Sequence, residues 1–251
     1  MKYLKILSLS LFFITFLENN VELEFQDKSF ENTNFKKDST YSIVVDSFLK
    51  KMKGNYGKSF EKKIWNHHDE LKNNLIKKKF NNFIFNDSDN KKIDLKDYKI
   101  PTIIIVTASW CAPCESLVPA INELSEKYKK KVKFIMLTHD VGKKAENYSS
   151  KFNNNVIVIP SLVKTNSMKP IKLEIGKFKH LFSFPTIYFL NSEKEIIEIQ
   201  IGAFKPESYF VNGKIDPETL FEDNSKIENS KEKTLINNLN LIKKGLEKIM
   251  K

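Results

Sequence analysis

The sequence predicts an α/β fold whose core is a parallel sheet with helices packed against it. Thr102–Thr107 is an apolar, β-branched run that is typical of a buried strand. Helical spacing follows from about Cys111 to Lys130, and Val132–Thr138 forms a second strand-like run. A helical pattern at Lys143–Phe152 and a short apolar run at Val156–Ile159 complete the series. Strands that alternate with helices in this way favour parallel pairing.

Further elements are predicted on both sides of this series. From Tyr41 to Lys79 apolar residues recur at helical spacing, and Gly54 and Gly57 divide the segment into two helices. We expect these helices to pack against the main domain. Turn-forming residues separate paired strand-like runs within residues 80–95, which predicts a hairpin.

The C-terminal half contains a second predicted hairpin, at residues 186–201, where two strand-like runs flank a polar turn. A short helix is expected around Gly176–Leu181. Residues 203–230 are polar and poorly patterned. Thr234–Met250 carries an apolar stripe at helical spacing, which predicts an amphipathic helix that covers the sheet.

Cys111 and Cys114 are the only cysteines, and two residues separate them at the junction between a strand and a helix. A helix N-terminus has unpaired N–H groups and a partial positive charge, which favour a thiolate at Cys111. Cys114, one turn further on, is close enough to resolve a mixed disulfide. Pro113 costs little in the first turn, where an N–H has no intrahelical partner. The pair predicts thiol–disulfide exchange; the alternative, half of a zinc site, needs two more ligands.

The stretch Trp110-Cys111-Ala112-Pro113-Cys114, with an apolar strand before it and Phe184-Pro185-Thr186 after it, resembles the thioredoxin fold. Within that fold the chain is similar to the secreted or membrane-tethered TlpA/ResA-like thiol–disulfide oxidoreductases of bacteria, over residues 80–204. The resemblance implies a thioredoxin-like α/β fold, with a central mixed sheet flanked by helices. To this the chain adds an N-terminal helical extension and a C-terminal amphipathic helix.

The resemblance also implies roles for single residues. The peptide bond before Pro185 is expected to be cis and to face the cysteines. The backbone of Phe184 is expected to pair with a substrate chain. Trp110 is expected to shield one side of the active site. The implied catalytic residues are Cys111, Cys114 and Pro185, and the implied substrate-binding residues are Trp110, Pro113, Phe184 and Thr186. Pro160 is a rival for the cis proline, and Pro185 could also be an ordinary strand-initiating proline.

The sequence departs from the family at the carboxylates that usually handle protons. Ile105 stands where thioredoxins have a buried acid, and Leu117 stands where ResA-like proteins have a glutamate. Glu115 could replace them, although a solvated glutamate in a first helical turn is the simpler interpretation. His139-Asp140 follows the second strand, at the sheet edge where sites form, and is a candidate for proton transfer or metal binding. His67-His68, in the extension, is expected at the surface.

The N-terminus has the pattern of an export signal, with Lys2 and Lys5 before an apolar run at Ile6–Leu17. This run is short for a transmembrane span, which needs about 20 residues, so a cleaved signal is favoured over a retained anchor or a buried helix. The predicted organisation is a signal or anchor (1–20), a linker and helical extension (21–79), a thioredoxin-like domain (80–204) and a polar segment with a helix (205–251).

Composition narrows the function further. All 42 basic residues are lysine and the net charge is +11, so the chain has no arginine for bidentate phosphate contacts. Without a basic stripe interleaved with aromatic residues, nucleic-acid binding is not expected. The sequence indicates no cofactor and no resident metal.

The sequence therefore predicts an exported, periplasmic or otherwise extracytoplasmic enzyme that reduces disulfides in other proteins. A reductase in an oxidising compartment needs a membrane electron donor. One alternative is a copper-binding protein that uses Cys111, Cys114 and His139, although such proteins space their cysteines three residues apart. Another is a non-catalytic interaction module. The client protein, the direction of electron flow and the oligomeric state stay open.

Overall fold

The computed structural model describes residues 35–36, 38–59, 63–87, 89–161, 173–175, 177–205 and 224–251. The predictions for residues 1–34, which include the export signal, fall outside these ranges, as does most of the polar segment before the last helix. Within the described ranges, none of the helices has both the length and the apolar character needed to cross a membrane.

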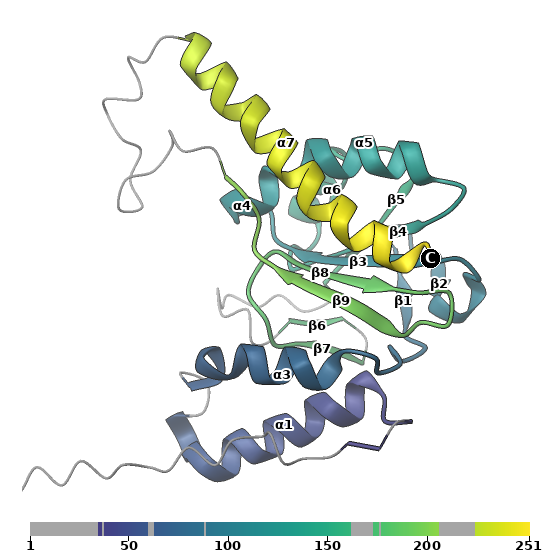
Figure 1. Cartoon of the computed structure of the whole chain (residues 1–251), viewed down its shortest axis with the longest axis vertical. Coiled ribbons are helices and arrows are strands. Elements are labelled where there is room, and N and C mark those ends of the chain that lie inside the picture. Colours follow the sequence, from purple (N-terminus) through teal and green to yellow (C-terminus); the bar gives the residue numbers. More distant parts are fainter. Residues whose placement is uncertain are drawn as a thin grey trace, which may run out of the picture.

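A five-stranded mixed sheet forms the centre of the molecule, in the order β5-β4-β3-β8-β9 (Figure 1). Its strands are β3 (Thr102–Thr107), β4 (Lys133–Thr138), β5 (Val156–Pro160), β8 (Thr186–Leu190) and β9 (Ile196–Ile201). Strands β3, β4 and β5 pair in parallel, whereas β8 pairs antiparallel with both β3 and β9. This arrangement confirms the predicted thioredoxin-like fold with its mixed sheet.

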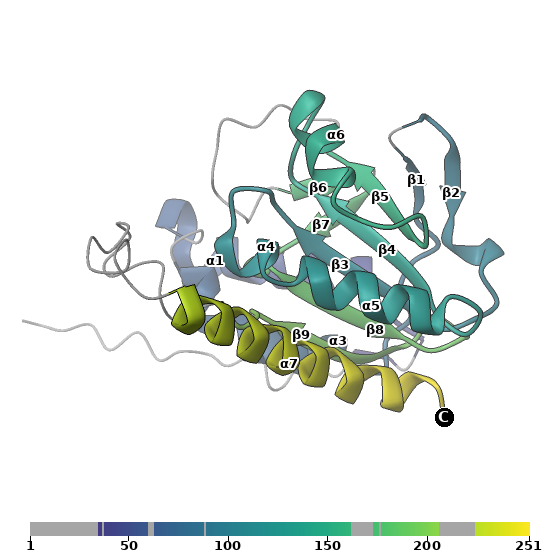
Figure 2. The ribbon, with the colours of Figure 1, turned by 90° about the horizontal axis from the view of Figure 1, so that it is seen from above.

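Both faces of the sheet are covered, which explains why every residue of β3 is buried. Side chains alternate along a strand, so Ile103 and Ile105 point into one core and Ile104 and Val106 into the other. Helices α5 (Val118–Tyr128), α6 (Lys143–Ser149) and α7 (Asn224–Ile249) cover the first face. Figures 1 and 2 show α7 running across the sheet beside α5, with α1 and α3 on the opposite side.

The N-terminal extension shares its core with the sheet. Helices α1 (Tyr41–Tyr56) and α3 (His68–Leu75), joined by short 3-10 turns (Gly57–Ser59 and Ile64–His67), bury their apolar faces against it. The predicted pair of packed helices is therefore confirmed, but Gly54 does not divide them, because α1 continues through it and ends just before Gly57. The surface position expected for the two adjacent histidines is wrong, because His67 is buried between Tyr56 and Glu70. His68 packs edge-on against Phe182, whereas the partners of His67 both lie within the extension.

The predicted helix at Cys111–Lys130 is two helices, α4 (Ala112–Glu115) and α5, separated by Ser116 and Leu117. Pro119 lies in the first turn of α5, and its missing N–H favours a break at this point. The predicted hairpin at residues 80–95 is confirmed by β1 (Ile84–Asn86) and β2 (Lys92–Asp94).

The short helix expected around Gly176–Leu181 is wrong, because Phe178–His180 form strand β7, which pairs antiparallel with β6 (Leu173–Ile175). Phe178 and His180 are buried while Lys179 is half-buried, a period of two that suits a strand rather than a helix. The predicted C-terminal helix is confirmed, but α7 begins ten residues earlier, at Asn224 rather than Thr234.

Candidate active site

Cys111 and Cys114 form a disulfide just beyond the C-terminal end of β3, with Cα atoms 5.2 Å apart. Cys111 is the N-cap of α4, and its carbonyl oxygen accepts hydrogen bonds from the N–H groups of Cys114 (2.8 Å) and Glu115 (3.1 Å). Cys111 is 8% exposed and Cys114 only 1%. An incoming thiol or disulfide can therefore reach Cys111 more readily than Cys114.

The Phe184–Pro185 turn lies beside this pair. The peptide bond before Pro185 is cis, as the resemblance implied. Thr186 of β8 is opposite Val106 of β3, so the turn that precedes β8 adjoins the loop that follows β3. Phe184 packs against the small cluster formed by Ala108 and the two cysteines. The structure thus brings the predicted residues of both segments together.

Hydrogen bonds fix the turn from two sides. The buried Thr186 hydroxyl donates to the carbonyl oxygen of Ser183 (2.6 Å), within the turn itself. The carbonyl oxygen of Pro185 accepts from the N–H of Gly202, directly after β9 (2.8 Å). Gly202 has a φ of +87°, a backbone conformation that glycine adopts without strain.

Aromatic rings surround Phe184. Trp110 is 49% exposed, and its ring centroid lies 5.7 Å from that of Phe184 and 6.0 Å from that of His139. His180 stacks on Phe184 with an interplanar angle of 4° and a centroid distance of 5.6 Å. Burial lowers the pKa of His139, and the charge of Asp140 opposes that shift. The exposed face of Trp110 gives the site an apolar rim.

Asp140 holds the loop that leads to Cys111. Its carboxylate is buried and accepts hydrogen bonds from the N–H and the hydroxyl of Ser109 (both 2.7 Å) and from the hydroxyl of Thr138 (2.6 Å). Both carboxylate oxygens are therefore occupied. This geometry gives Asp140 a structural role, and the proton-transfer or metal-binding role considered from the sequence for His139-Asp140 stays a prediction. Within the described ranges, no three His, Cys, Asp or Glu side chains are placed to share a metal ion.

The positions that lack the family's carboxylates are apolar and packed. Ile105 and Leu117 are each 1% exposed and lie in the core on the α5 and α7 side of the sheet. Glu115, expected to be solvated, is half-buried and forms an ion pair with Lys151 at 2.6 Å. That pair ties α4 to the segment after α6.

Two features near the site were not predicted. The first is a buried polar chain: His180 Nδ1 lies 3.1 Å from the hydroxyl of Tyr188, which lies 3.3 Å from the hydroxyl of Tyr41. Burial lowers the pKa of His180 to about 3, so the ring is neutral. The second is Asn238 of α7, whose amide is bonded to the residue after α4. His180 lies in a segment predicted as helix, and no sequence signal singles out Asn238.

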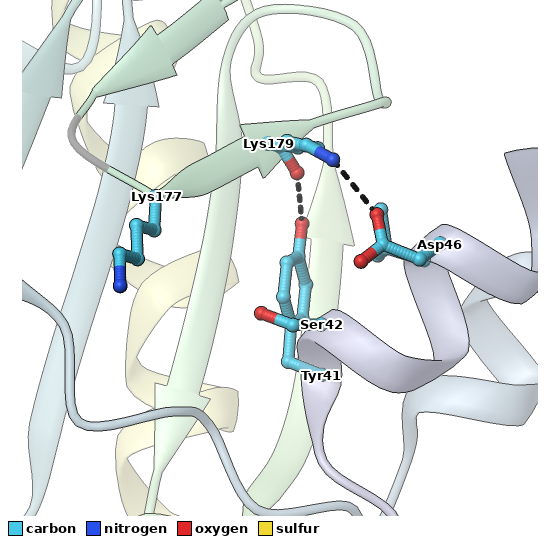
Figure 3. Close-up of a pocket in the computed structure, with 6 residues that line it drawn as sticks. Tyr41, Ser42, Asp46, Lys177 and Lys179 are labelled. Carbon is cyan, nitrogen blue, oxygen red and sulfur yellow. Dashed lines mark hydrogen bonds and ion pairs between the residues drawn. The ribbon is translucent and has the colours of Figure 1, made fainter.

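A cavity of about 380 Å³ lies between the start of α1 and β7 (Figure 3). Beside it the Tyr41 hydroxyl donates to the carbonyl oxygen of Lys179 (2.8 Å), and the Lys179 ammonium pairs with Asp46 (2.9 Å). None of the described residues that line it was predicted for the site. The disulfide, not this cavity, is therefore the candidate active site.

The chain is similar to several known proteins. The Thioredoxin family model matches residues 82–177. Thiol-disulfide oxidoreductase ResA of a Bacillus cereus strain is 31% identical over 134 residues, which are 51% of this chain and 70% of the relative. Its counterpart in Bacillus anthracis is 30% identical over the same number of residues and the same shares. Among solved structures, StoA from Bacillus subtilis is 20% identical, with a TM-score of 0.36 over 49% of this chain and 89% of that one.

The match to ResA covers more than two thirds of that protein's length at over 30% identity. The Thioredoxin match spans β3, α4, α5, β4 and the disulfide between them. The chain therefore belongs to the thioredoxin-fold, ResA-like family of thiol-disulfide oxidoreductases.

Proposed function

We propose that this oxidoreductase reduces disulfides in other proteins through Cys111 and Cys114, and that it does so outside the cytoplasm. The observation that carries the proposal is the unequal exposure of a cysteine pair at a helix N-terminus, 8% for Cys111 and 1% for Cys114, beside the cis Phe184–Pro185 turn. The more accessible cysteine can attack a substrate, and the less accessible one can complete the exchange begun by its neighbour.

The reaction begins with both cysteines reduced. The Cys111 thiolate, favoured by the partial positive charge of the helix N-terminus, attacks one sulfur of the substrate disulfide. The substrate S–S bond breaks, a mixed disulfide forms, and the departing substrate sulfur takes up a proton. The Cys114 thiolate then attacks the Cys111 sulfur, which releases the second substrate thiol. Two electrons pass to the substrate and the protein is left with the Cys111–Cys114 disulfide.

The surrounding residues orient the substrate. The backbone of Phe184 pairs with an extended substrate segment, in the manner of an added strand. Pro185 and Thr186 hold that backbone in place, while Trp110 and Pro113 provide an apolar surface next to Cys111. Reduction of the pair for another cycle needs a dithiol donor, which we place in the membrane because the compartment itself is oxidising.

The reduction potential tests the direction of electron flow. The full chain is equilibrated in dithiothreitol or glutathione buffers, and the free cysteines are then alkylated and counted by mass spectrometry. A reductase predicts a value near that of thioredoxin, about −270 mV. A value near about −120 mV, that of a strong periplasmic oxidant, contradicts reduction and assigns disulfide formation instead.

Export is tested separately. Support for it comes from the charged and apolar pattern of residues 1–20. Fused to a reporter enzyme that is active only outside the cytoplasm, these residues are expected to give full activity. A variant with Leu11, Phe12 and Phe13 replaced by aspartate is expected to give none. An inactive fusion with the natural sequence contradicts export through this segment.

A further inference from the structure

A buried amide in the C-terminal helix bonds two segments near the disulfide, the end of α4 and the residues that follow β9. Asn238 of α7 is fully buried. Its Nδ2 donates to the carbonyl oxygens of Ser116 (3.0 Å) and Phe204 (3.1 Å), and its Oδ1 accepts from the N–H of Phe204 (3.0 Å). Both amide hydrogens are donated to carbonyl oxygens, so the hydrogen-bonding capacity of this buried side chain is met. Few other side chains could make the same set of bonds at this position.

Of the two residues that Asn238 bonds, Ser116 belongs to the segment that carries the cysteines. We call the contacts among Asn238, Ser116 and Phe204 the junction. Ser116 follows α4 directly, two residues after Cys114, at the break before α5. Its hydroxyl donates to the carbonyl oxygen of Pro113 (2.8 Å) and contacts the carbonyl oxygen of Phe204. Since Pro113 lies between the two cysteines, the position of Ser116 is tied to that of the disulfide.

Phe204, the other residue that Asn238 bonds, belongs to the segment that contacts Pro185. It belongs to residues 202–204, the segment that leaves β9 and begins with the bond from the N–H of Gly202 to the carbonyl of Pro185. This segment therefore runs from the cis Phe184–Pro185 turn to the end of α4. Asn238 forms hydrogen bonds to its last residue, Phe204. The Phe204 side chain is 48% exposed, comparable to Trp110 at 49%.

We propose that Asn238 is a positioning residue for thiol–disulfide exchange with protein substrates. It fixes the spacing between α4, which carries the cysteines, and residues 202–204, which are bonded to the Phe184–Pro185 turn. A peptide chain that pairs with Phe184 must lie against these two parts, whereas a small disulfide needs only the Cys111 sulfur. The inference rests on the proposed function, because it assumes that the substrate is a protein.

The Cys111 sulfur also has contacts that lie outside this junction. Ala108 and Phe184 pack around it, and Asp140 holds the preceding loop through Ser109. None of these contacts involves α7. Loss of the Asn238 amide is therefore expected to weaken peptide binding while the reactivity of Cys111 stays the same.

The test compares two substrates of the pre-reduced full chain, a synthetic cyclic peptide closed by one disulfide and bis(2-hydroxyethyl) disulfide. For Asn238→Ala, which loses the three hydrogen bonds of the amide, we expect KM for the peptide to rise about tenfold. The rate with the small disulfide is expected to stay within about twofold. Asn240→Ala, at an exposed position of the same helix, is the matched control and is expected to behave as the wild type.

Asn238→Ser is a second variant that controls for misfolding, because its hydroxyl retains one hydrogen-bond donor. Its KM for the peptide is expected to lie between those of the wild type and Asn238→Ala. Equal losses with both substrates, or no loss with the peptide, overturn the inference. A wild type that reduces neither substrate contradicts the proposed function instead. A wild type that reduces both, with Asn238→Ala unchanged, contradicts the inference alone.

Discussion

Gly245 provides a direct test of how α7 lies on the sheet. A Cβ added to Gly245 would overlap the ring of Phe189 in β8, and that ring is fully buried. Gly54, near the end of α1, is the matched control, because a Cβ there meets nothing within 4 Å and the position is exposed. Alanine is therefore expected to have opposite effects at two helical glycines.

The magnitudes follow from two opposing effects. Replacing glycine by alanine inside a helix favours the folded state by up to about 1 kcal/mol. At Gly245 this gain is opposed by overpacking against Phe189, which typically costs about 1–3 kcal/mol. Because the ring is enclosed on all sides, we expect the overpacking to dominate. Gly245→Ala should lose about 1–2 kcal/mol of unfolding free energy, and Gly54→Ala should gain about 0.5–1 kcal/mol.

Urea unfolding of the oxidised full chain, followed by circular dichroism, measures both free energies of unfolding. In thermal unfolding Gly245→Ala should lower Tm by about 2–8 °C, while Gly54→Ala should raise it. If Gly245→Ala stabilises the protein as much as Gly54→Ala does, α7 does not lie against Phe189. The position inferred for Asn238 would then be wrong as well.

Three further predictions concern other parts of the structure. Asp140→Ala removes three hydrogen bonds to a buried carboxylate and should cost about 3 kcal/mol in urea unfolding; Ser109→Ala removes only one of them and should cost about 1.5 kcal/mol. Equal costs for the two variants would contradict the role of the Asp140 carboxylate in holding the loop before Cys111. The pKa of His180 is about 3 in the folded state and about 6.5 when unfolded, so the unfolded chain binds more protons between these values. Stability should therefore fall, by up to about 1.4 kcal/mol per pH unit, as the pH drops below 6.5. His180→Gln should flatten that dependence, and unchanged slopes in unfolding experiments from pH 7 to pH 4 would contradict it. Lys151→Ala breaks the partly exposed pair with Glu115 and should change stability by less than about 1 kcal/mol; a larger loss would show that the pair is more than a surface contact.

The position of the cysteine pair in the fold could be predicted because its signals are local in sequence. Two cysteines separated by two residues, after a buried strand and before a helix, place the sulfurs at a helix N-terminus. The role of Pro185 followed from the family resemblance, and Pro185 was preferred to Pro160 because a strand, a turn and a second strand follow it. Neither inference needs information from distant parts of the chain. The mixed sheet itself followed from the family resemblance, since the alternation of elements alone favours parallel pairing.

What could not be predicted depends on contacts between distant segments. Phe178 and His180 are buried by α1 and by Phe184, and without those neighbours their spacing did not exclude a helix. His67 is buried because Tyr56 and Glu70 bond to its ring, although a histidine in a Lys-rich helical segment usually faces solvent. Asn238 resembles the exposed asparagines around it in sequence, and only the fold brings it to Ser116.

The central claim is that Cys111 attacks the substrate and Cys114 resolves the intermediate. The most direct measurement incubates reduced full-chain Cys114→Ser with the cyclic peptide disulfide and identifies covalent adducts by mass spectrometry. Once the freed peptide thiol is alkylated, a stable one-to-one mixed disulfide through Cys111 is expected, because neither the protein nor the peptide then has a thiol that can resolve it, and Cys111→Ser should form none. An adduct through Cys114 in Cys111→Ser, or no adduct with either variant, would contradict the assigned roles.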